Sequence, residues 1–291
     1  MVIISDKFGQ LGNSLFLFAH FIANAIEFDY KVCYPGFHTY AHYFMGTKNN
    51  FFCTYPAEPS YPDKYNHLRR ISNAAIIICA YCYRKLNLRI LDVGVFDISS
   101  MGVSEGDYSL DDTKFITSRE ASRILFVKGW AFRDERSFRK HAESVRRFFT
   151  PVGRHLENIS RLIDEARRDC DILVGIHIRQ GDYKNWLNGK HYYATADYVN
   201  IIRQAGELWG EKRVRFLVCS NEKQDEQLFE GLDYIWGSGN QLEDMYAFAA
   251  CDYLIGPPST YTMWASFYGS VPLHVVEALD IPLTPEGFGL F

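Results

Sequence analysis

The fold is decided by the stretch from Leu173 to Tyr183, which reads LVGIHIRQGDY. It starts inside an apolar run, Ile172 to Ile176, of the kind that forms a strand buried on both faces of a parallel sheet. A Gly-Asp pair then predicts a turn. His177 and Arg179 lie two residues apart, so a strand would place both side chains on the same face. Because open α/β sheets bind ligands at the carboxyl ends of their strands, this stretch predicts a ligand site.

The chemistry of Arg179 allows two interpretations. Its planar guanidinium stays charged and donates two parallel hydrogen bonds, which suits a phosphate. Alternatively, Arg179 pairs with Asp182, and His177 is a core histidine whose hydrogen bonds are satisfied. Taken alone, this stretch leaves both interpretations open.

The second half of the chain alternates between strand and helix patterns. Expected strands cover 172–178, 214–219, 234–236, 253–255 and 273–276, and expected helices cover 197–209, 222–229, 241–250 and 260–268. Repeated βα units predict a parallel sheet with helices on both faces, so the fold class is α/β.

The first half begins with a similar unit. A strand over 2–5, a glycine-bearing turn and a helix over 14–28 would form it, and further strands are expected over 31–34 and 124–128. Residues 35–112 are rich in aromatic side chains, which could stack on acceptor sugars. Packing into an irregular subdomain is the simpler interpretation.

The boundary between two domains is expected close to residue 160. A basic amphipathic helix is predicted over 134–149. Thr150 would cap a second helix beginning at Pro151, because proline is favoured at the first helical position. The predicted domains are therefore 1–160 and 161–291.

Net charge and cysteine spacing argue against a nucleic-acid-binding protein and against a zinc site. The chain has 291 residues with a net charge of -4, which gives no electrostatic argument for a nucleic-acid partner. Its seven cysteines are scattered, and the lone Cys79–Cys82 pair has no second pair, so we expect reduced thiols rather than a zinc site.

The N-terminal residues and the apolar stretches bear on localisation. Met1 to Ser5 is followed at once by Asp6 and Lys7, unlike a signal peptide. No apolar stretch is long enough to cross a membrane. We therefore expect a cytoplasmic protein, with peripheral association at the inner membrane face left open.

Two further features could complete a ligand site. Ser259 and Thr260 stand where a helix should begin, either as caps or as groups that hold a phosphate at the positive end of the helix. In a parallel sheet this helix start and Arg179 would share the carboxyl edge. Asp244 would either accept hydrogen bonds from guanine or simply favour the helix dipole.

Three motifs carry a resemblance to a known family. Residues 177–183, HIRQGDY, resemble the HxRxGDY motif of the α-1,2-fucosyltransferase family and its fucosyltransferase relatives. Residues 9–13, GQLGN, resemble the family's N-terminal GxLGN turn, and 258–266, PSTYTMWAS, its C-terminal NSTFSWWAS stretch. The motifs stand in family order and span nearly the whole chain.

The resemblance implies a glycosyltransferase B-type fold, with two Rossmann-like domains facing across a cleft. It implies an enzyme that moves fucose from GDP-fucose to a glycan hydroxyl, with inversion and with no metal or cofactor. Residues 1–160 would form the acceptor side and 161–291 the GDP-sugar side. The donor-site residues carried over by position are Arg179 on the β-phosphate, His177 as its support, Ser259, Thr260 and Tyr261 on the pyrophosphate, Asp244 on the guanine, and Gly12 and Asn13 from the first domain.

Some features leave the mechanism and the substrate open. Ser14 and Gln180 replace a common Gln and a common second Arg, and 256–258 also departs from the family pattern. Asp182 is the nearest carboxylate for a general base, but an ion pair with Arg179 would make it a poor one, and His177 is the other candidate. Two alternative functions stay open. The protein could be a transferase of the same fold that uses another nucleotide sugar, or a non-catalytic relative that binds a sugar or a nucleotide.

Overall fold

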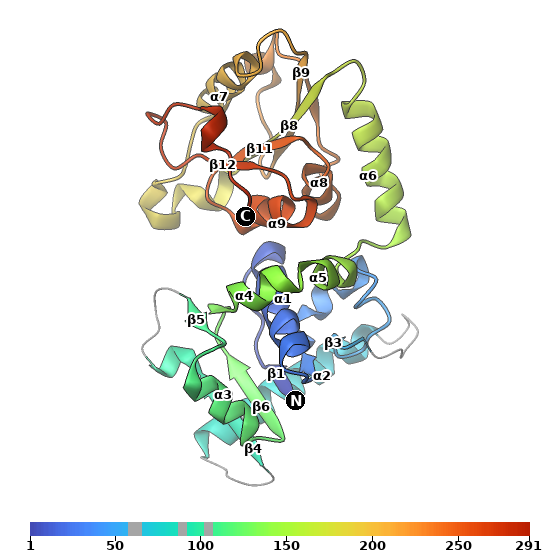
Figure 1. The fold of residues 1–291 in the computed structure, drawn as a ribbon, viewed down its shortest axis with the longest axis vertical. Helices are drawn as coiled ribbons and strands as arrows, with labels where there is room; N and C mark the ends of the chain where they lie inside the picture. Colours follow the sequence, from blue (N-terminus) through green and yellow to red (C-terminus); the bar gives the residue numbers. More distant parts are fainter. Residues whose placement is uncertain (58–65, 87–91, 102–106) are drawn as a thin grey trace. The chain divides into compact units, whose positions relative to one another are not determined.

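The computed structural model describes residues 1–57, 66–86, 92–101 and 107–291. The chain divides into two compact units, Met1–Val152 (unit 1) and Gly153–Phe291 (unit 2). Each unit contains its own five-stranded sheet with helices packed on it (Figure 1). Helix α6 (Gly153–Ala166) belongs to unit 2, where it packs on helix α8 (Gln241–Phe248).

The sheet of unit 2 is entirely parallel, in the order β10-β9-β8-β11-β12. Its strands are β8 (Ile172–Ile178), β9 (Val214–Ser220), β10 (Tyr234–Trp236), β11 (Tyr253–Gly256) and β12 (Leu273–Val275). Besides α6, its helices are α7 (Thr195–Glu207), α8 (Gln241–Phe248) and α9 (Thr260–Gly269). The predicted βα alternation is confirmed here.

Strand β8 is the central strand of unit 2, and every one of its residues is buried. Ile172, Val174 and Ile176 pack in one cluster with buried side chains of α7, and burial of such a side chain contributes about 1.5–3 kcal/mol. Gly175 lies on the opposite face. A Cβ there would lie 2.6 Å from the ring of Phe248, so its lack of a side chain lets α8 approach the sheet.

The sheet of unit 1 has the order β3-β2-β1-β6-β4, in which only the β2–β3 pair is antiparallel. Its strands are β1 (Val2–Ile4), β2 (Val32–Cys33), β3 (Thr54–Tyr55), β4 (Val93–Asp97) and β6 (Ile124–Lys128), with a separate pair β5 (Tyr108–Ser109) and β7 (Phe132–Arg133). Its helices are α1 (Leu11–Glu27), α2 (Asn66–Lys85), α3 (Thr113–Glu120), α4 (Glu135–Lys140) and α5 (Ala142–Phe148).

Aromatic side chains form much of the core of unit 1. Phe18 of the largely buried helix α1 contacts the rings of Tyr34, Phe37 and Phe149 at centroid distances of 5.5–5.7 Å. Phe44 is also fully buried and packs on Phe37 and Phe149. Phe37 and Phe44, which belong to the region 35–112, are therefore packed in the core of unit 1, as the simpler interpretation predicted for them.

Three predictions of local structure are wrong, the first two because of contacts that the sequence pattern does not contain. The helix expected over 134–149 breaks at His141, which has non-helical dihedral angles and contacts Glu27 of α1. The helix expected at Pro151 begins at Gly153, because the backbone of 150–152 pairs with that of 43–45. The helix expected over 222–229 is only a 3₁₀ turn, Glu226–Phe229.

Candidate functional site

The carboxyl ends of β8 and β11 bring two predicted site segments together. These strands are direct neighbours, with Val174 opposite Tyr253 and Ile176 opposite Ile255. The hydroxyl of Tyr183, in the turn after β8, donates a hydrogen bond to the carbonyl of Pro258. The guanidinium of Arg179 lies over the Tyr183 ring, 5.6 Å from its centroid. The β8 turn and the loop before α9 thus form one structure.

Arg179 forms the ion pair that the structural interpretation predicted. Its Nη2 donates to Oδ2 of Asp182 at 2.8 Å, and the Arg179 side chain is 15% exposed against 51% for Asp182. The pair holds the guanidinium over Tyr183 at the edge of the sheet. Because one carboxylate oxygen already accepts from Arg179, Asp182 is a poor candidate for a general base.

His177 is buried beneath this edge. Its ring packs on that of Tyr261, with centroids 4.9 Å apart, and contacts Phe248. Burial, together with the charge of Arg179, lowers the pKa of His177 to about 3, so the imidazole is neutral near pH 7. The prediction of a fully satisfied core histidine is wrong, because Nδ1 has no hydrogen-bond partner within the described part of the chain. A pKa of this size also makes His177 a weak general base.

Ser259 is the N-cap of α9, as the capping interpretation predicted. Its Oγ accepts a hydrogen bond from the amide of Tyr261, and Thr260 is the first residue of the helix. The Tyr261 hydroxyl donates to the carbonyl of Gln241 at 2.7 Å, which ties α9 to α8. Capping leaves Ser259 half-buried at the positive end of a helix, where an anion is favoured.

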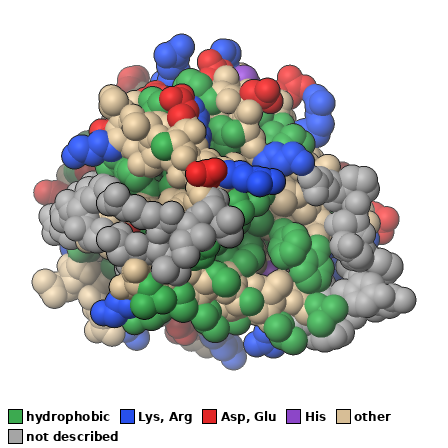
Figure 2. All heavy atoms as spheres, turned by 90° about the horizontal axis from the view of Figure 1, so that it is seen from below, with side chains coloured by type: hydrophobic (Ala, Val, Ile, Leu, Met, Phe, Trp, Pro, Cys, Tyr) green, Lys and Arg blue, Asp and Glu red, His purple; other side chains and the backbone are tan. Residues whose placement is uncertain are grey.

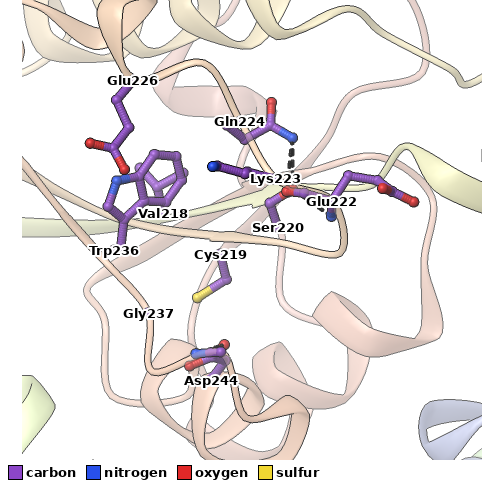
Figure 3. A pocket seen from close by; sticks show the side chains of 11 residues that line it. Val218, Cys219, Ser220, Glu222, Lys223, Gln224, Glu226, Trp236, Gly237 and Asp244 are labelled. Carbon is purple, nitrogen blue, oxygen red and sulfur yellow. Dashed lines mark hydrogen bonds between the residues drawn. The ribbon is translucent and has the colours of Figure 1, made fainter.

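A pocket of ≈ 200 Å³ lies at the carboxyl ends of β9 and β10 (Figure 3). Asp244, early in α8, lies at its edge, and its carboxylate accepts from the amide and hydroxyl of Ser238 and from the amide of Gly239 at 2.6–3.1 Å. Burial raises the pKa of Asp244, and the bonds from Ser238 and Gly239 oppose this. Since each carboxylate oxygen has two lone pairs, Asp244 can still accept from a ligand.

Sequence reasoning missed most of this pocket. The lining residues other than Asp244 are Val218, Cys219, Ser220, Glu222, Lys223, Gln224, Glu226, Trp236, Gly237 and Gly239. Cys219 and Trp236 stand at the carboxyl ends of two correctly predicted strands, so the same rule that singled out Arg179 could have found them. Gly237 has a steric role, because a Cβ there would lie 2.5 Å from the Cys219 sulfur.

The departure at Gln180 has a structural explanation. Its side chain is buried, and its amide donates to the carbonyl of Tyr193 at 3.0 Å. Its carbonyl accepts at 2.9 Å from the amide of Gln224, which lines the pocket and is held by Thr195 and Ser220 as well. Position 180 therefore supports the pocket wall in this protein.

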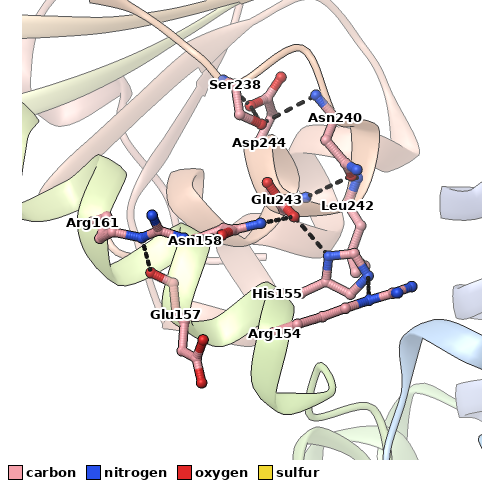
Figure 4. A network of polar contacts seen from close by, with 10 residues as sticks. All are labelled: Arg154, His155, Glu157, Asn158, Arg161, Ser238, Asn240, Leu242, Glu243 and Asp244. Carbon is pink, nitrogen blue, oxygen red and sulfur yellow. Dashed lines mark hydrogen bonds and ion pairs between the residues drawn. The ribbon is translucent and has the colours of Figure 1, made fainter.

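A second polar network fixes the start of α8 (Figure 4). Oε1 of Glu243 contacts Nδ1 of His155 at 2.7 Å and accepts from the amide of Asn158 at 2.8 Å. Burial alone would raise the pKa of Glu243, but these hydrogen bonds lower it below its usual value. Helix α6 is thus attached to α8 at the residue that precedes Asp244.

The remaining predicted residues belong to unit 1. Gly12 and Asn13 lie in the first turn of α1. Gly9 has φ of +62°, and a Cβ there would lie 2.5 Å from the side-chain nitrogen Nδ2 of Asn13. Both the backbone conformation and the lack of space therefore favour glycine at this position. Ser14 is buried, and its hydroxyl donates to the carbonyl of Phe8 at 2.9 Å, so it closes the turn.

Comparisons with known proteins place the sequence in a family. The sequence profile of glycosyl transferase family 11 matches residues 119–272. The alpha-1,2-colitosyltransferase of Escherichia coli is 26% identical over 176 residues, and the match covers 57% of this chain and 58% of that protein. This chain thus spans a little over half the length of that curated relative.

Solved structures are similar over nearly the whole chain. A variant of FUT1 from Arabidopsis thaliana in complex with GDP has a TM-score of 0.61 and 15% identity, covering 99% of this chain and 73% of that one. NodZ alpha-1,6-fucosyltransferase soaked with GDP-fucose has a TM-score of 0.55 and 18% identity, with 94% and 93% covered. POFUT1 in complex with GDP-fucose has a TM-score of 0.56 and 10% identity, with 93% and 94% covered. At these identities the likeness shows the fold, which confirms the predicted pair of parallel-sheet domains of the glycosyltransferase B type.

Proposed function

Because the chain belongs to glycosyl transferase family 11, we propose that it is an α-1,2-fucosyltransferase-like enzyme that transfers fucose from GDP-fucose to a glycan hydroxyl with inversion and without a metal ion. The observation that carries this proposal is the shared carboxyl edge in unit 2. There the Arg179 turn and the α9 start are joined through Tyr183 and Pro258. Strands β9 and β10, which lie beside β8 in the same sheet, end at the pocket that Asp244 lines.

The pocket suits the base of the donor. Guanine has two donors on one edge, the N1–H and the exocyclic amine. Oδ1 of Asp244 already accepts two hydrogen bonds from Ser238, whereas Oδ2 accepts one, from the Gly239 amide, and keeps a lone pair for a donor of the base. A base without these donors would form no hydrogen bond with Oδ2 of Asp244 and would bind more weakly. GDP is therefore the nucleotide we propose.

The charge at the β8–β11 edge suits the diphosphate. In a single displacement the acceptor oxygen bonds to the sugar carbon while the bond from that carbon to the β-phosphate oxygen breaks, and GDP leaves with the electron pair. Arg179 and the N-terminus of α9 would stabilise the charge that develops on the diphosphate. Neutral His177 adds no charge of its own but could hydrogen-bond through Nδ1.

His177 and Asp182 are the candidate general bases at this edge, and their surroundings bear on whether the sugar–phosphate bond breaks before the acceptor loses its proton. The pKa of His177 is about 3, so its imidazole does not readily take a proton from an ordinary alcohol near pH 7, and one carboxylate oxygen of Asp182 is held by Arg179. We therefore propose that the bond to the diphosphate breaks well before the acceptor loses its proton. The acceptor oxygen, already partly bonded to the sugar carbon and hence strongly acidic, then gives its proton to water or to an oxygen of the departing diphosphate.

The colitosyltransferase relative supports a second candidate donor. Colitose is fucose without its 3-hydroxyl, so a GDP-linked 3-deoxy sugar would need the same base and diphosphate contacts. The two donors can be separated by measuring turnover with GDP-fucose and GDP-colitose under identical conditions. A ratio of kcat/KM above about tenfold in either direction would assign the donor, since one hydroxyl contact in a polar site commonly gives that much or more.

Incubation with GDP-fucose on a glycan array, with and without a chelator, tests the main proposal. We expect fucosylated products in both conditions, with NMR of the product showing the inverted anomeric configuration. Loss of turnover with the chelator would contradict the metal-free mechanism. Tight GDP binding without any transfer would instead support a non-catalytic nucleotide-binding relative.

A further inference from the structure

Helix α2 packs on the sheet of unit 1 by one face. Its Ala80 and Ile76 belong to a cluster with Ile3, Cys33 and Phe126 of the sheet. Near its start Arg69 is also buried, and Nη2 of this residue donates to the backbone carbonyl of Lys48 at 2.9 Å. The inward face of α2 therefore includes a charged side chain that holds the helix to the body of unit 1.

The outward face of α2 is apolar. Between Ile71 and Tyr83, every residue that the structure describes as exposed is apolar: Ile71, Ala74, Ala75, Ile78, Cys79 and Tyr81. The side chains of Ile71, Ile78 and Tyr81 are 65%, 60% and 51% exposed. A surface helix of a globular protein normally has the opposite arrangement, with polar residues outside. The apolar face of α2 is therefore available to a partner.

Charge indicates what kind of partner this is. The sequence of α2 contains no Asp or Glu, and exposed basic residues stand near both of its ends, at Arg70 and Lys85. The whole chain has a net charge of -4, so this cationic helix stands out from its surroundings. On the face of the molecule drawn in Figure 2, hydrophobic side chains lie among Lys, Arg, Asp and Glu side chains. An apolar face flanked by basic residues is typical of a helix that lies at an anionic lipid surface.

We propose that α2 docks unit 1 on an anionic membrane surface, with the helix lying in the plane of the interface. Ile71, Ile78 and Tyr81 enter the boundary between headgroups and acyl chains, while Arg70 and Lys85 contact acidic headgroups. Among the residues that the structure describes, no helix is long and apolar enough to cross a bilayer, so the contact is peripheral. This docking goes beyond the proposed transfer reaction and does not depend on it.

Cosedimentation of the whole chain with vesicles tests the proposal. We expect binding to equimolar phosphatidylglycerol and phosphatidylcholine, weaker binding to phosphatidylcholine alone, and release as salt increases. The double variant Ile71→Glu with Ile78→Glu should lower the partition coefficient by at least about a hundredfold, since each buried Ile contributes roughly a factor of ten or more. Arg70→Glu should remove part of the salt-dependent binding.

Leu279→Glu with Ile281→Glu is the matched control, because these two apolar residues of unit 2 are 49% and 51% exposed and the charge change is the same. Far-UV circular dichroism and thermal unfolding of each variant report that it is folded, whether or not it binds GDP. Failure of the whole chain to sediment with anionic vesicles overturns the proposal, as does unchanged binding by the α2 variant. A lipid-free dimer that this variant dissociates, without vesicle binding, would assign the face to a second copy of the chain and also overturn it.

Discussion

The two ends of the proposed donor site are built differently. At the β8–β11 edge the important groups are charges and a helix start: Arg179 with its partner Asp182, and the cap at Ser259. At the β9–β10 end the pocket lining includes Gln224 and the buried carboxylate of Asp244, whose hydrogen bonds lie within the protein, and the indole of Trp236, whose Nε1 has no partner among the described residues. The first arrangement suits an atom whose charge changes during reaction, and the second suits a group that is recognised but does not react. Mutations at the two ends should therefore affect different kinetic constants.

The largest effect is expected from Arg179→Ala. The variant should lower kcat by about a hundredfold or more, because removal of a donor that stabilises developing charge typically costs that much. GDP affinity, measured by calorimetry, should fall much less than kcat. Arg179→Lys should restore only part of the rate, since it keeps the charge but not the planar fork. Equal losses of kcat and GDP affinity would show that Arg179 only binds the donor.

Asp244→Ala should act mainly on donor affinity. Loss of a carboxylate that accepts from the base should raise the KM for GDP-fucose about tenfold to a hundredfold, with kcat nearly unchanged, because hydrogen bonds to charged groups contribute about 1.5–3 kcal/mol. Ser238→Ala is the matched control, since it removes one internal partner of Asp244 and leaves the carboxylate. The reverse result, a lower kcat with unchanged KM, would remove the proposed division between the two ends.

How much of this site the sequence predicts depends on where each residue stands. Strand β8 was predicted over its observed length, because its residues are continuously apolar and all are buried. The family resemblance, carried by three motifs in order, is confirmed by the profile match over 119–272. Gln180 and Gln224 could not be paired in advance, because two polar residues separated along the chain show no periodic pattern. The break at His141 depends on Glu27 in another helix, a tertiary contact that local propensity does not include.

The Gln180–Gln224 pair gives a test of the pocket end alone. Gln180→Ala should lower the free energy of unfolding by about 1–3 kcal/mol, because it leaves the buried amide of Gln224 with one partner fewer. Gln224→Ala should do the same, and the double variant should cost less than the sum, as expected for residues in one network. Urea denaturation of the four proteins measures this. Simple additivity would mean that the two amides act independently.

The smallest effect is expected from a change of pH on GDP affinity. Asp244 at the β9–β10 end should respond to it, whereas His177 at the β8–β11 edge should not. Burial raises the pKa of Asp244, so as pH falls this carboxylate protonates earlier than an ordinary Asp and loses its ability to accept from the base. GDP affinity should therefore weaken a few-fold between about pH 7 and pH 5, while the contribution of Asp244 to folding stability changes in the opposite direction, because the folded state favours the protonated acid.

Calorimetry with GDP across this range measures the change. Asp244→Asn should remove the part of the pH dependence of GDP affinity that comes from the Asp244 carboxylate, so that only protonation of the GDP phosphate remains. His177, whose pKa is about 3, stays neutral throughout and should add nothing. If the wild type and Asp244→Asn showed the same pH profile, the base would not be bound at Asp244, and the two ends would no longer differ in the way argued above.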